Sequence, residues 1–205
     1  MSRNIFIIDY RMGNLFSVYK RLKRFSNNIK ISEDYNEIKK ADKIILPGVG
    51  HFGKAMQNIK NLKLTDTLNE LAINKKIPVL GICLGMQIMT KFSEEGNITG
   101  LGWFDAKVVK FKHTNNSYKN PHIGWNNLIV TKKSLIFEGL PEHHEFYFVH
   151  SYHLKTNVES IISAETEYEY KFVSAIENGN IFGVQFHPEK SHEYGDLIFN
   201  NFLKI

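Results

Sequence analysis

In the first half of the chain, short apolar runs alternate with longer segments in which polar and apolar residues mix. The apolar runs predict strands, and the mixed segments predict helices. The expected strands cover residues 4–9, 28–32, 43–46 and 78–82. The expected helices cover residues 14–24, 34–39, parts of 54–74, and 86–92. Strands that alternate with helices favour a parallel, doubly wound sheet, whose ligands lie at the carboxyl ends of the strands.

The second half of the chain is richer in strands. Strands are expected at residues 104–111, 127–131, 146–150, 161–164, 173–176 and 181–185. A last helix is expected at about residues 194–203, and polar or glycine-bearing loops at 97–102 and 113–120. No linker separates the halves. We therefore expect one α/β domain over residues 1–205, with a mainly parallel, twisted sheet flanked by helices and an antiparallel extension in the second half.

Composition places the chain among ordinary globular domains. Its 205 residues suffice for a substantial core, and 42% of them are hydrophobic and 23% charged. No apolar run reaches the length of a membrane-spanning helix, about 18 residues. The first expected strand begins at residue 4, which leaves no space for a secretory signal. The single cysteine excludes an internal disulfide and suits the reducing cytosol, so we expect a cytoplasmic protein without membrane contact.

The net charge of +5 comes from scattered lysines. The densest basic cluster is Tyr19–Arg24, which we interpret as the solvated face of the first helix rather than a patch for nucleic acid or an acidic partner. No basic motif interleaved with aromatic residues indicates RNA binding. Among nine histidines, His143 and His144 form the densest group, but it lacks H-E-x-x-H spacing. We expect no metal, no cofactor and no nucleic acid.

The single cysteine lies where a predicted strand meets a predicted helix. Cys83 follows the apolar run 78–82 and is flanked by Gly81 and Gly85, in the G-x-C-x-G frame of a nucleophile elbow. Such a sharp turn leaves no room for side chains beside the nucleophile, which explains the glycines. The following helix N-terminus favours the thiolate, and the N–H of Leu84 points where an oxyanion would form. The alternative is an inert thiol in the core.

A thiol nucleophile needs a base, and the base needs an orienting group. His187 and Glu189 suit these roles, because they follow the strand expected at 181–185 in a His-Pro-Glu tripeptide. Pro188 fixes the turn, so that both side chains can project to the same side. The alternative is a strand-end turn whose side chains are solvated.

A glycine-rich loop follows the strand expected at 43–46. Gly48, Val49 and Gly50 lie in the segment P-G-V-G-H-F-G, and its glycines let the backbone approach a ligand closely. We interpret this segment as an oxyanion loop. The alternatives are a plain strand-to-helix turn and a phosphate-binding loop, and the latter is disfavoured because neither phosphate-loop motif is present.

Together these segments resemble the class I, triad-type glutamine amidotransferases. The resemblance is carried by three segments in the order of that family, Pro47–Gly50, Gly81–Gln87 and Phe186–Ser191. Over nearly its whole length the chain is similar to one branch of the family, the glutaminase subunits of imidazole glycerol phosphate synthases. Further motifs indicate this branch: Ile8–Tyr10, Gly13–Leu15, Pro121–Asn126 and Tyr147–Tyr152.

The resemblance implies a flavodoxin-like fold and hydrolysis of L-glutamine to glutamate and ammonia through a thioester. Cys83 would be the nucleophile, His187 would carry the proton, and Glu189 would orient the histidine. The resemblance also implies oxyanion and substrate-binding residues, namely Gly48, Val49, Gly50, Leu84, Gln87, His150, Ser151 and Tyr152.

A partner protein is implied as well. In the resembled branch, the glutaminase forms a heterodimer with a cyclase built as a (β/α)8 barrel. The cyclase uses the ammonia to split a phosphoribulosyl-carboxamide into imidazole glycerol phosphate and aminoimidazole carboxamide ribotide, in histidine biosynthesis. The interface residues implied for this chain are Tyr10, Arg11, Met12, Asn14 and Trp125.

Arg11 departs from the family pattern, in which this position is usually glycine. The departure leaves open a paralogous amidotransferase that supplies ammonia to another synthase, such as an enzyme that amidinates a surface sugar. A non-catalytic scaffold is disfavoured by the intact Cys83, His187 and Glu189. A cysteine peptidase is disfavoured by the glycine loop and by the continuation Gly85–Gln87.

Overall fold

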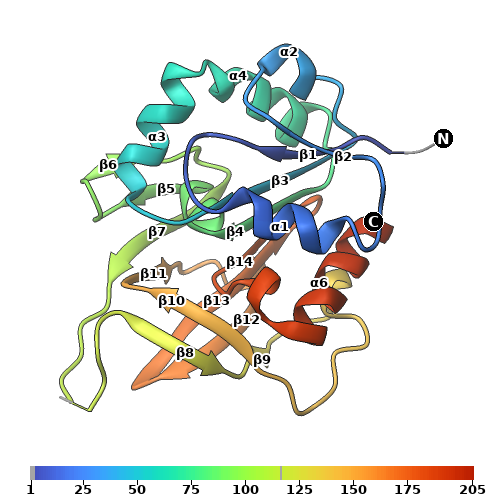
Figure 1. The fold of residues 1–205 in the computed structure, drawn as a ribbon. Coiled ribbons are helices and arrows are strands. Elements are labelled where there is room, and N and C mark those ends of the chain that lie inside the picture. The colour runs from blue at the N-terminus through green and yellow to red at the C-terminus, as the bar shows by residue number, and fades with distance from the viewer. Residues whose placement is uncertain (1–2, 116) are drawn as a thin grey trace.

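Five parallel strands form the half of the main sheet that contains the candidate nucleophile (Figure 1). The computed structural model describes residues 3–115 and 117–205. In spatial order the strands are β2 (Ile29–Ser32), β1 (Ile5–Ile8), β3 (Lys43–Gly48), β4 (Val79–Cys83) and β14 (Ile181–Val184). The last strand of the chain, β14, thus lies beside β4 and parallel to it. The parallel sheet expected for the first half is confirmed.

Helices cover both faces of these strands (Figure 1). They are α1 (Leu15–Leu22), α2 (Tyr35–Ile38), α3 (Phe52–Asn61), α4 (Leu64–Asn69), α5 (Leu84–Ile88) and α6 (His192–Lys204). One π-helical turn at Glu70–Asn74 continues α4. Short 3₁₀ turns lie at Leu135–Phe137, Glu159–Ile161 and Pro188–Lys190.

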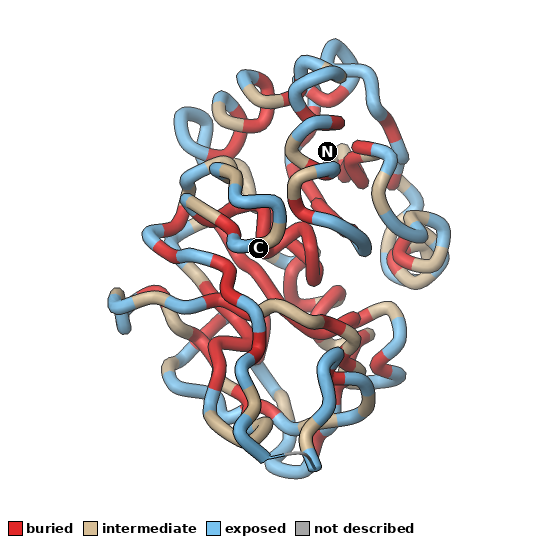
Figure 2. Tube along the Cα trace, turned by 90° about the vertical axis from the view of Figure 1, so that its left-hand side faces the viewer, coloured by how far each residue is buried: buried red, intermediate tan, exposed pale blue. Residues whose placement is uncertain are grey.

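Side chains of each parallel strand enter two separate cores in alternation. In β1, Phe6 and Ile8 pack in the core that contains Leu68 of α4, whereas Ile5 and Ile7 pack in the core that contains α1 and α6. Because both faces are covered, β1, β4 and β14 are apolar at every position rather than at every second one, whereas the edge strand β2 exposes Lys30 and Ile31. Figure 2 shows the resulting band of buried residues, in red, through the centre of the molecule.

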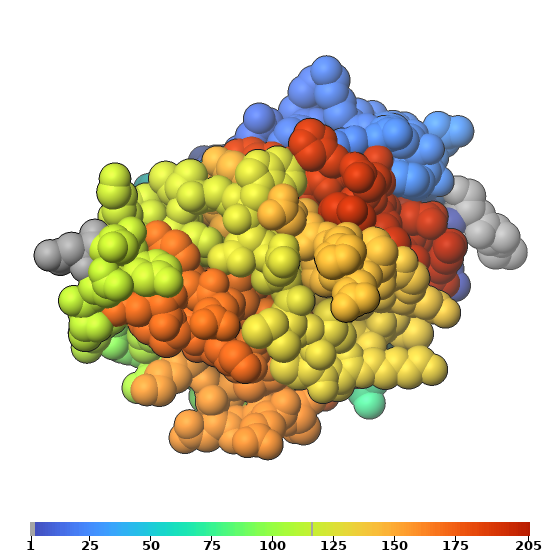
Figure 3. All heavy atoms as spheres, turned by 90° about the horizontal axis from the view of Figure 1, so that it is seen from below, coloured from blue at the N-terminus to red at the C-terminus, as the bar shows by residue number. Residues whose placement is uncertain are grey.

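The second half of the chain extends the sheet, mostly in antiparallel fashion. Beyond β14 follow β13 (Tyr170–Asn178), β11 (Tyr152–Lys155), β7 (Phe104–Lys110), β5 (Thr90–Ser93) and β6 (Ile98–Thr99). β12 (Ile162–Tyr168) pairs with β13 and with β9 (Ile129–Val130). A separate two-stranded sheet consists of β8 (His122–Asn126) and β10 (Phe146–His150). Figure 3 shows the yellow-green to orange segments of this half covering much of the lower surface.

The helix after the candidate nucleophile is shorter than expected. α5 ends at Ile88 rather than at residue 92, and residues 90–93 form β5. The Ile88 carbonyl accepts a hydrogen bond from the N–H of Leu101 (2.7 Å), and the Met89 carbonyl accepts one from the N–H of Trp103 (2.8 Å). The helix therefore ends at the point where N–H groups of the returning chain, rather than those of a next helical turn, bind its carbonyls. The expectation of a helix over 86–92 was wrong because a local pattern does not reveal partners so far along the chain.

Other short strands also fall outside the expected ranges. β6 lies in the segment 97–102 that was expected to be a loop, and no strand was expected at β8 or β11. The strand expected at 127–131 is reduced to the two residues of β9. β8, β9 and β11 are each stabilised by a non-local pairing, with β10, β12 and β7 respectively, whereas β6 forms a hairpin with β5. Their sequences alone do not indicate that pairing.

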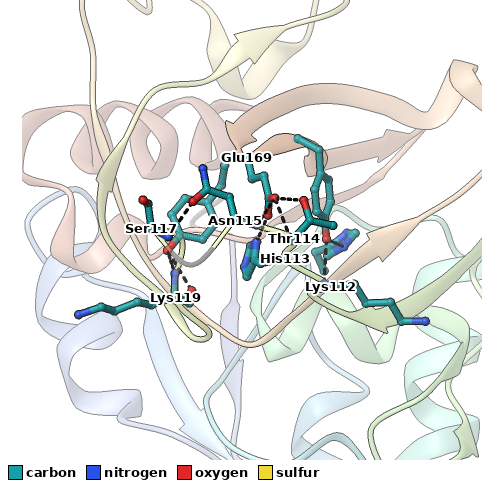
Figure 4. Close-up of polar contacts among 10 residues, drawn as sticks. Lys112, His113, Thr114, Asn115, Ser117, Lys119 and Glu169 are labelled. Atoms are coloured by element: carbon teal, nitrogen blue, oxygen red, sulfur yellow. Dashed lines mark hydrogen bonds and ion pairs between the residues drawn. The ribbon is translucent and has the colours of Figure 1, made fainter.

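Four contacts of the half-buried Glu169 carboxylate anchor the loop after β7 (Figure 4). Glu169, at the tight turn between β12 and β13, receives hydrogen bonds from the N–H (2.9 Å) and hydroxyl (2.7 Å) of Thr114 and from the N–H of Asn115 (2.9 Å). Its other oxygen lies 2.6 Å from Nδ1 of His113. The hydrogen bond from the Thr114 hydroxyl, supported by the other three, outweighs burial and lowers the pKa of Glu169 to about 2.

We expect Glu169→Ala to release this loop while the rest of the sheet stays folded. Amide hydrogen exchange at Thr114 and Asn115 should accelerate, because their acceptor is lost. In the parent, a carboxyl with a lowered pKa stabilises the fold fully above its ordinary pKa, near 4.5, and loses that effect as the pH falls through about 2. Glu167→Ala, at an exposed position of β12, is the control. Unchanged exchange in Glu169→Ala would contradict the anchoring role.

Candidate active site

Cys83 occupies a strained turn between β4 and α5. Its backbone lies at φ +53° and ψ −110°, a region that ordinary residues rarely adopt. A Cβ on Gly85 would collide with the carbonyl oxygen of Leu46, and a Cβ on Gly81 would lie 2.7 Å from the Met89 terminal methyl carbon. The glycines beside Cys83 are therefore required by the packing, as the elbow interpretation predicts. The cysteine itself is 5% exposed.

His187 reaches the cysteine because β14 and β4 are adjacent parallel strands. Val184 pairs with Ile82, so the residues that follow each strand emerge side by side. The N–H of His187 donates to the carbonyl of Tyr147 (2.9 Å), and its own carbonyl accepts from the hydroxyl of Ser191 (2.7 Å). The backbone of the histidine is thus held on both sides before its ring makes any contact.

Glu189 binds the ring of His187 on the side away from the cysteine. Its Oε1 lies 2.8 Å from Nδ1 of His187, across the 3₁₀ turn that begins with Pro188. Both side chains are buried, at 2% and 6% exposure. Since a carboxylate only accepts, Nδ1 bears a proton, and Nε2 is left for another group. Nε2 is buried and has no nitrogen or oxygen partner in the described part of the chain.

The electrostatic environment of His187 favours its cationic form. Burial alone would lower the pKa of the imidazole, but the charge of Cys83, the interaction with its side chain, and the contact with Glu189 together raise that pKa to about 10. A second histidine, His150, is fully buried near this group, and burial holds its pKa well below the ordinary value. The site therefore favours the cationic form of His187 and the neutral form of His150.

The glycine loop lies against the elbow. Gly48, the last residue of β3, pairs with Cys83 across the parallel ladder. Gly50 has φ +115°, and both Val49 and Gly50 are exposed, whereas Gly48 is buried. The hydroxyl of Tyr10 occupies the place that a side chain at residue 48 would need. The loop can thus present backbone N–H groups beside the sulfur without any intervening side chain.

A cavity of about 310 Å³ opens beside the sulfur. Its lining includes the cysteine and seven of the eight predicted oxyanion and substrate-binding residues, Gly48 being the exception. The lining residues are Val49, Gly50, Cys83, Leu84, Gln87, Glu95, Pro121, Val149, His150, Ser151 and Tyr152. Sequence reasoning missed Glu95, Pro121 and Val149. A wider hollow of about 590 Å³ over β7, β11 and β13 contains none of the triad residues.

Glu95 had no recognisable signal in the sequence. It belongs to the turn between β5 and β6, two strands that were not expected as such. Its Oε2 accepts a hydrogen bond from the N–H of Phe52 (2.7 Å), at the start of α3. This bond fixes the carboxylate at the rim of the cavity. Because α3 follows the glycine loop directly, the same contact connects the loop to the rim.

Four of the five predicted interface residues lie at the surface. Arg11, Asn14 and Trp125 are exposed, and Met12 is half-buried. Tyr10 is the exception. Its side chain is fully buried against the glycine loop, where burial and then the nearby charge of Cys83 raise the pKa of its hydroxyl. The ring of Tyr10 therefore lies in the core rather than at the surface, because the apolar strand β1 leads it directly there.

Arg11 stands in a backbone conformation that favours glycine, at φ +62°. This explains physically why a glycine suits this position. The side chain of Arg11 forms an exposed ion pair with Glu33 (3.1 Å), and the backbone N–H of Arg11 donates to the side chain of Asp9 (2.8 Å). Elsewhere on the predicted interface, Trp125 stacks on His192 at a centroid distance of 5.0 Å.

In residues 3–115 and 117–205, no group of three or more histidine, cysteine or acidic side chains could hold a metal ion. Within the same ranges, no helix combines the length and the apolar character needed to cross a membrane.

Comparisons with known proteins identify the family of the chain. The sequence profile of the class-I glutamine amidotransferases matches residues 6–205. The chain belongs to this family. A relative from Methanococcus maripaludis, named imidazole glycerol phosphate synthase subunit HisH 2, is 47% identical over 98% of both chains. A relative from Pelagibacter ubique, named imidazole glycerol phosphate synthase subunit HisH, is 42% identical over 98% of this chain and 100% of its own length.

Solved structures confirm the fold of the family. A structure titled PurLQS from Thermotoga maritima superposes with a TM-score of 0.78 at 18% identity, over 100% of this chain and 99% of the other. A structure described as a glutamine amidotransferase superposes with a TM-score of 0.75 at 17% identity, over 98% of this chain and 97% of the other. The fold class expected from the sequence is thus confirmed.

We expect Gly85→Ala to destabilise the amidotransferase domain strongly. The new methyl group would meet the Leu46 carbonyl, which belongs to the central strand β3 and has no freedom to move. A loss of about 3 kcal/mol in the free energy of unfolding is expected, measured by urea denaturation. Gly102→Ala is the control, since its Cβ meets nothing within 4 Å and only its φ of +74° is unfavourable. That change should cost about 1 kcal/mol; equal losses in the two variants would contradict the packing argument.

We expect Glu189→Gln to lower the pKa of His187, because the neutral amide no longer stabilises the imidazolium. The measurement is the titration of the ring nitrogens by ¹⁵N NMR. The sign follows from linkage: a raised histidine pKa stabilises the fold fully below the ordinary value, near 6.5, and that effect is lost as the pH rises through about 10. In Glu189→Gln, this stabilisation should be lost at a lower pH than in the parent. Glu193→Gln, an exposed change in α6, should leave the titration in place.

Proposed function

We propose that the chain is a glutaminase subunit that hydrolyses L-glutamine to glutamate and ammonia. The observation that supports this most strongly is the convergence of Cys83, His187 and Glu189 at the carboxyl ends of adjacent strands, beside a cavity of about 310 Å³. Residues 1–205 would act as one amidotransferase domain. No cofactor enters the reaction.

The chemistry would proceed in two stages. The sulfur of Cys83 attacks the side-chain amide carbon of glutamine, and the carbonyl oxygen becomes an oxyanion. His187 gives a proton to the departing nitrogen, ammonia leaves, and a thioester remains. Water then attacks the thioester while His187 takes one of its protons, glutamate leaves, and the thiolate returns. Glu189 keeps the imidazole oriented and stabilises its positive charge.

Backbone N–H groups would stabilise the oxyanion in both stages. The N–H of Leu84 is one donor, and the segment Gly48, Val49, Gly50 would supply the second. The amino-acid end of the substrate would lie toward the rim of the cavity. There Glu95, the acidic residue of the lining, can accept hydrogen bonds from the α-ammonium group of glutamine. Gln87, Ser151 and Tyr152 complete that wall, together with the neutral ring of His150.

The ammonia would pass to a partner enzyme. Several relatives are named as subunits of imidazole glycerol phosphate synthase, and these names favour this pathway over surface-sugar amidination. We therefore propose a cytoplasmic heterodimer with a (β/α)8-barrel cyclase in histidine biosynthesis. The partner would contact the chain beside the glycine loop, on a surface that includes Arg11, Met12, Asn14 and Trp125.

We expect Cys83→Ala to abolish glutamine-dependent synthesis in the reconstituted complex while synthesis from added ammonium salts continues at the parent rate. The cysteine only generates ammonia, and the partner performs the later steps. Product formation with each nitrogen source is the measurement. His187→Asn should be nearly as damaging with glutamine, and equally harmless with ammonium. Loss of the ammonium-dependent rate in a folded Cys83→Ala complex would contradict the division of labour.

A further inference from the structure

One buried side chain outside the triad contacts the nucleophilic sulfur. Nε2 of Gln185 donates a hydrogen bond to Sγ of Cys83 at 3.5 Å, and Gln185 is completely buried. The residue follows β14 directly, and its N–H donates to the carbonyl of Ser174 in β13 (2.8 Å). Neither the elbow nor the His-Pro-Glu turn, as interpreted from the sequence, assigned this glutamine any task.

The orientation of this amide is determined by its neighbours. Nε2 of Gln87 donates to the carbonyl oxygen of Tyr152 (3.0 Å), and a backbone carbonyl can only accept. The same Nε2 therefore has a hydrogen to donate to Oε1 of Gln185 (3.0 Å). With its oxygen committed to Gln87, Gln185 must turn its NH₂ group toward the sulfur. If the amide of Gln185 were flipped, its NH₂ group would face the NH₂ group of Gln87, and its oxygen would face the sulfur of Cys83. Two donors and two acceptors would then lie together.

The carbonyl oxygen of Tyr152, which determines the orientation of both glutamine amides, has a second donor. The carbonyl oxygen of Tyr152 also accepts from Nδ1 of His150 (2.8 Å), whose Nε2 lies 3.0 Å from Nδ1 of His122. Burial keeps the pKa of both rings low, His122 at about 4, so both are neutral and each donates in one direction. A continuous set of hydrogen bonds thus extends from β8 to the sulfur of Cys83.

We propose that Gln185 is a further catalytic residue, which donates an N–H to the Cys83 sulfur and stabilises its thiolate. The inference rests on the proposed function of Cys83 as nucleophile. An amide N–H is a better partner for anionic sulfur than for the neutral thiol, because the hydrogen bond is then charge-assisted. The donor would act twice, on the attacking thiolate and on the thiolate that leaves when water opens the thioester. No bond to Gln185 forms or breaks in either step.

A purely structural role makes a different prediction. In that case the amide would only fill space and connect β14 to α5, and its replacement by an apolar side chain of similar length would change stability alone. The thiol would keep its reactivity in every variant that folds. The two roles therefore separate in a measurement of the thiol that does not depend on glutamine turnover.

The test uses the full chain, whose single cysteine makes any thiol signal specific to Cys83. We compare the parent with Gln185→Met by the rate of alkylation with iodoacetamide at neutral pH and by the ultraviolet absorbance of the thiolate as a function of pH, with Cys83→Ser as the blank. Alkylation should slow about tenfold or more, the effect of losing one hydrogen bond to a charged group. The thiolate absorbance should develop at higher pH. Ser174→Ala, in the neighbouring strand, should leave both measurements at parent values.

A parent-like alkylation rate and thiolate absorbance in folded Gln185→Met would overturn the proposal. If Gln185→Met does not fold, Gln87→Met provides a second route, since it releases the oxygen of Gln185 and lets the amide rotate away. Slower alkylation in that variant supports the proposal, and an unchanged rate overturns it. Glutaminase activity of the parent is assayed separately with its partner. A failure of the proposed function would appear there and would leave the thiol measurements intact.

Discussion

The register of three neighbouring parallel strands is the constraint on which the site depends. β3, β4 and β14 end at the same edge of the sheet, with Gly48 opposite Cys83 and Val184 opposite Ile82. A shift of one residue in either pairing would turn every side chain of that strand to the opposite face. Both faces are buried in tightly packed cores, so such a shift is strongly disfavoured. The packing of the whole molecule thereby fixes the distance between the sulfur and the imidazole.

Burial strengthens the electrostatic interactions among the polar groups of the site. Cys83, Gln185 and His187 are nearly inaccessible, and each has a partner chosen by geometry rather than by solvent. In such surroundings charges interact more strongly than in water, which is why the imidazole keeps its proton far above neutral pH. The cavity beside them admits the substrate to a region in which the polar groups are already oriented.

Local signals predicted the parts of the site that follow from local geometry. The elbow at Cys83 and the His187–Glu189 turn were recognisable because their backbone geometry requires glycine or proline at particular positions. Glu95 and Gln185 were not, because their roles depend on partners more than forty residues away, Phe52 and Cys83. The missed strands β8 and β11 and the shortened α5 likewise depend on pairing partners outside the local window of sequence. The longer helix, the loop expected at 97–102 and the strand expected at 127–131 each followed a local pattern where tertiary packing decides.

The position of β14 also has a consequence for the way the protein is made. This strand is inserted between β4 and β13, although it follows both of them, and every element between them, in the sequence. Until it arrives, the edge of β4 beside the cysteine is open, and such an edge can pair with other chains. The histidine and glutamate arrive with the same segment. Thiol and base therefore cannot meet until β14 has been synthesised, and its insertion closes the sheet and assembles the catalytic site in one event.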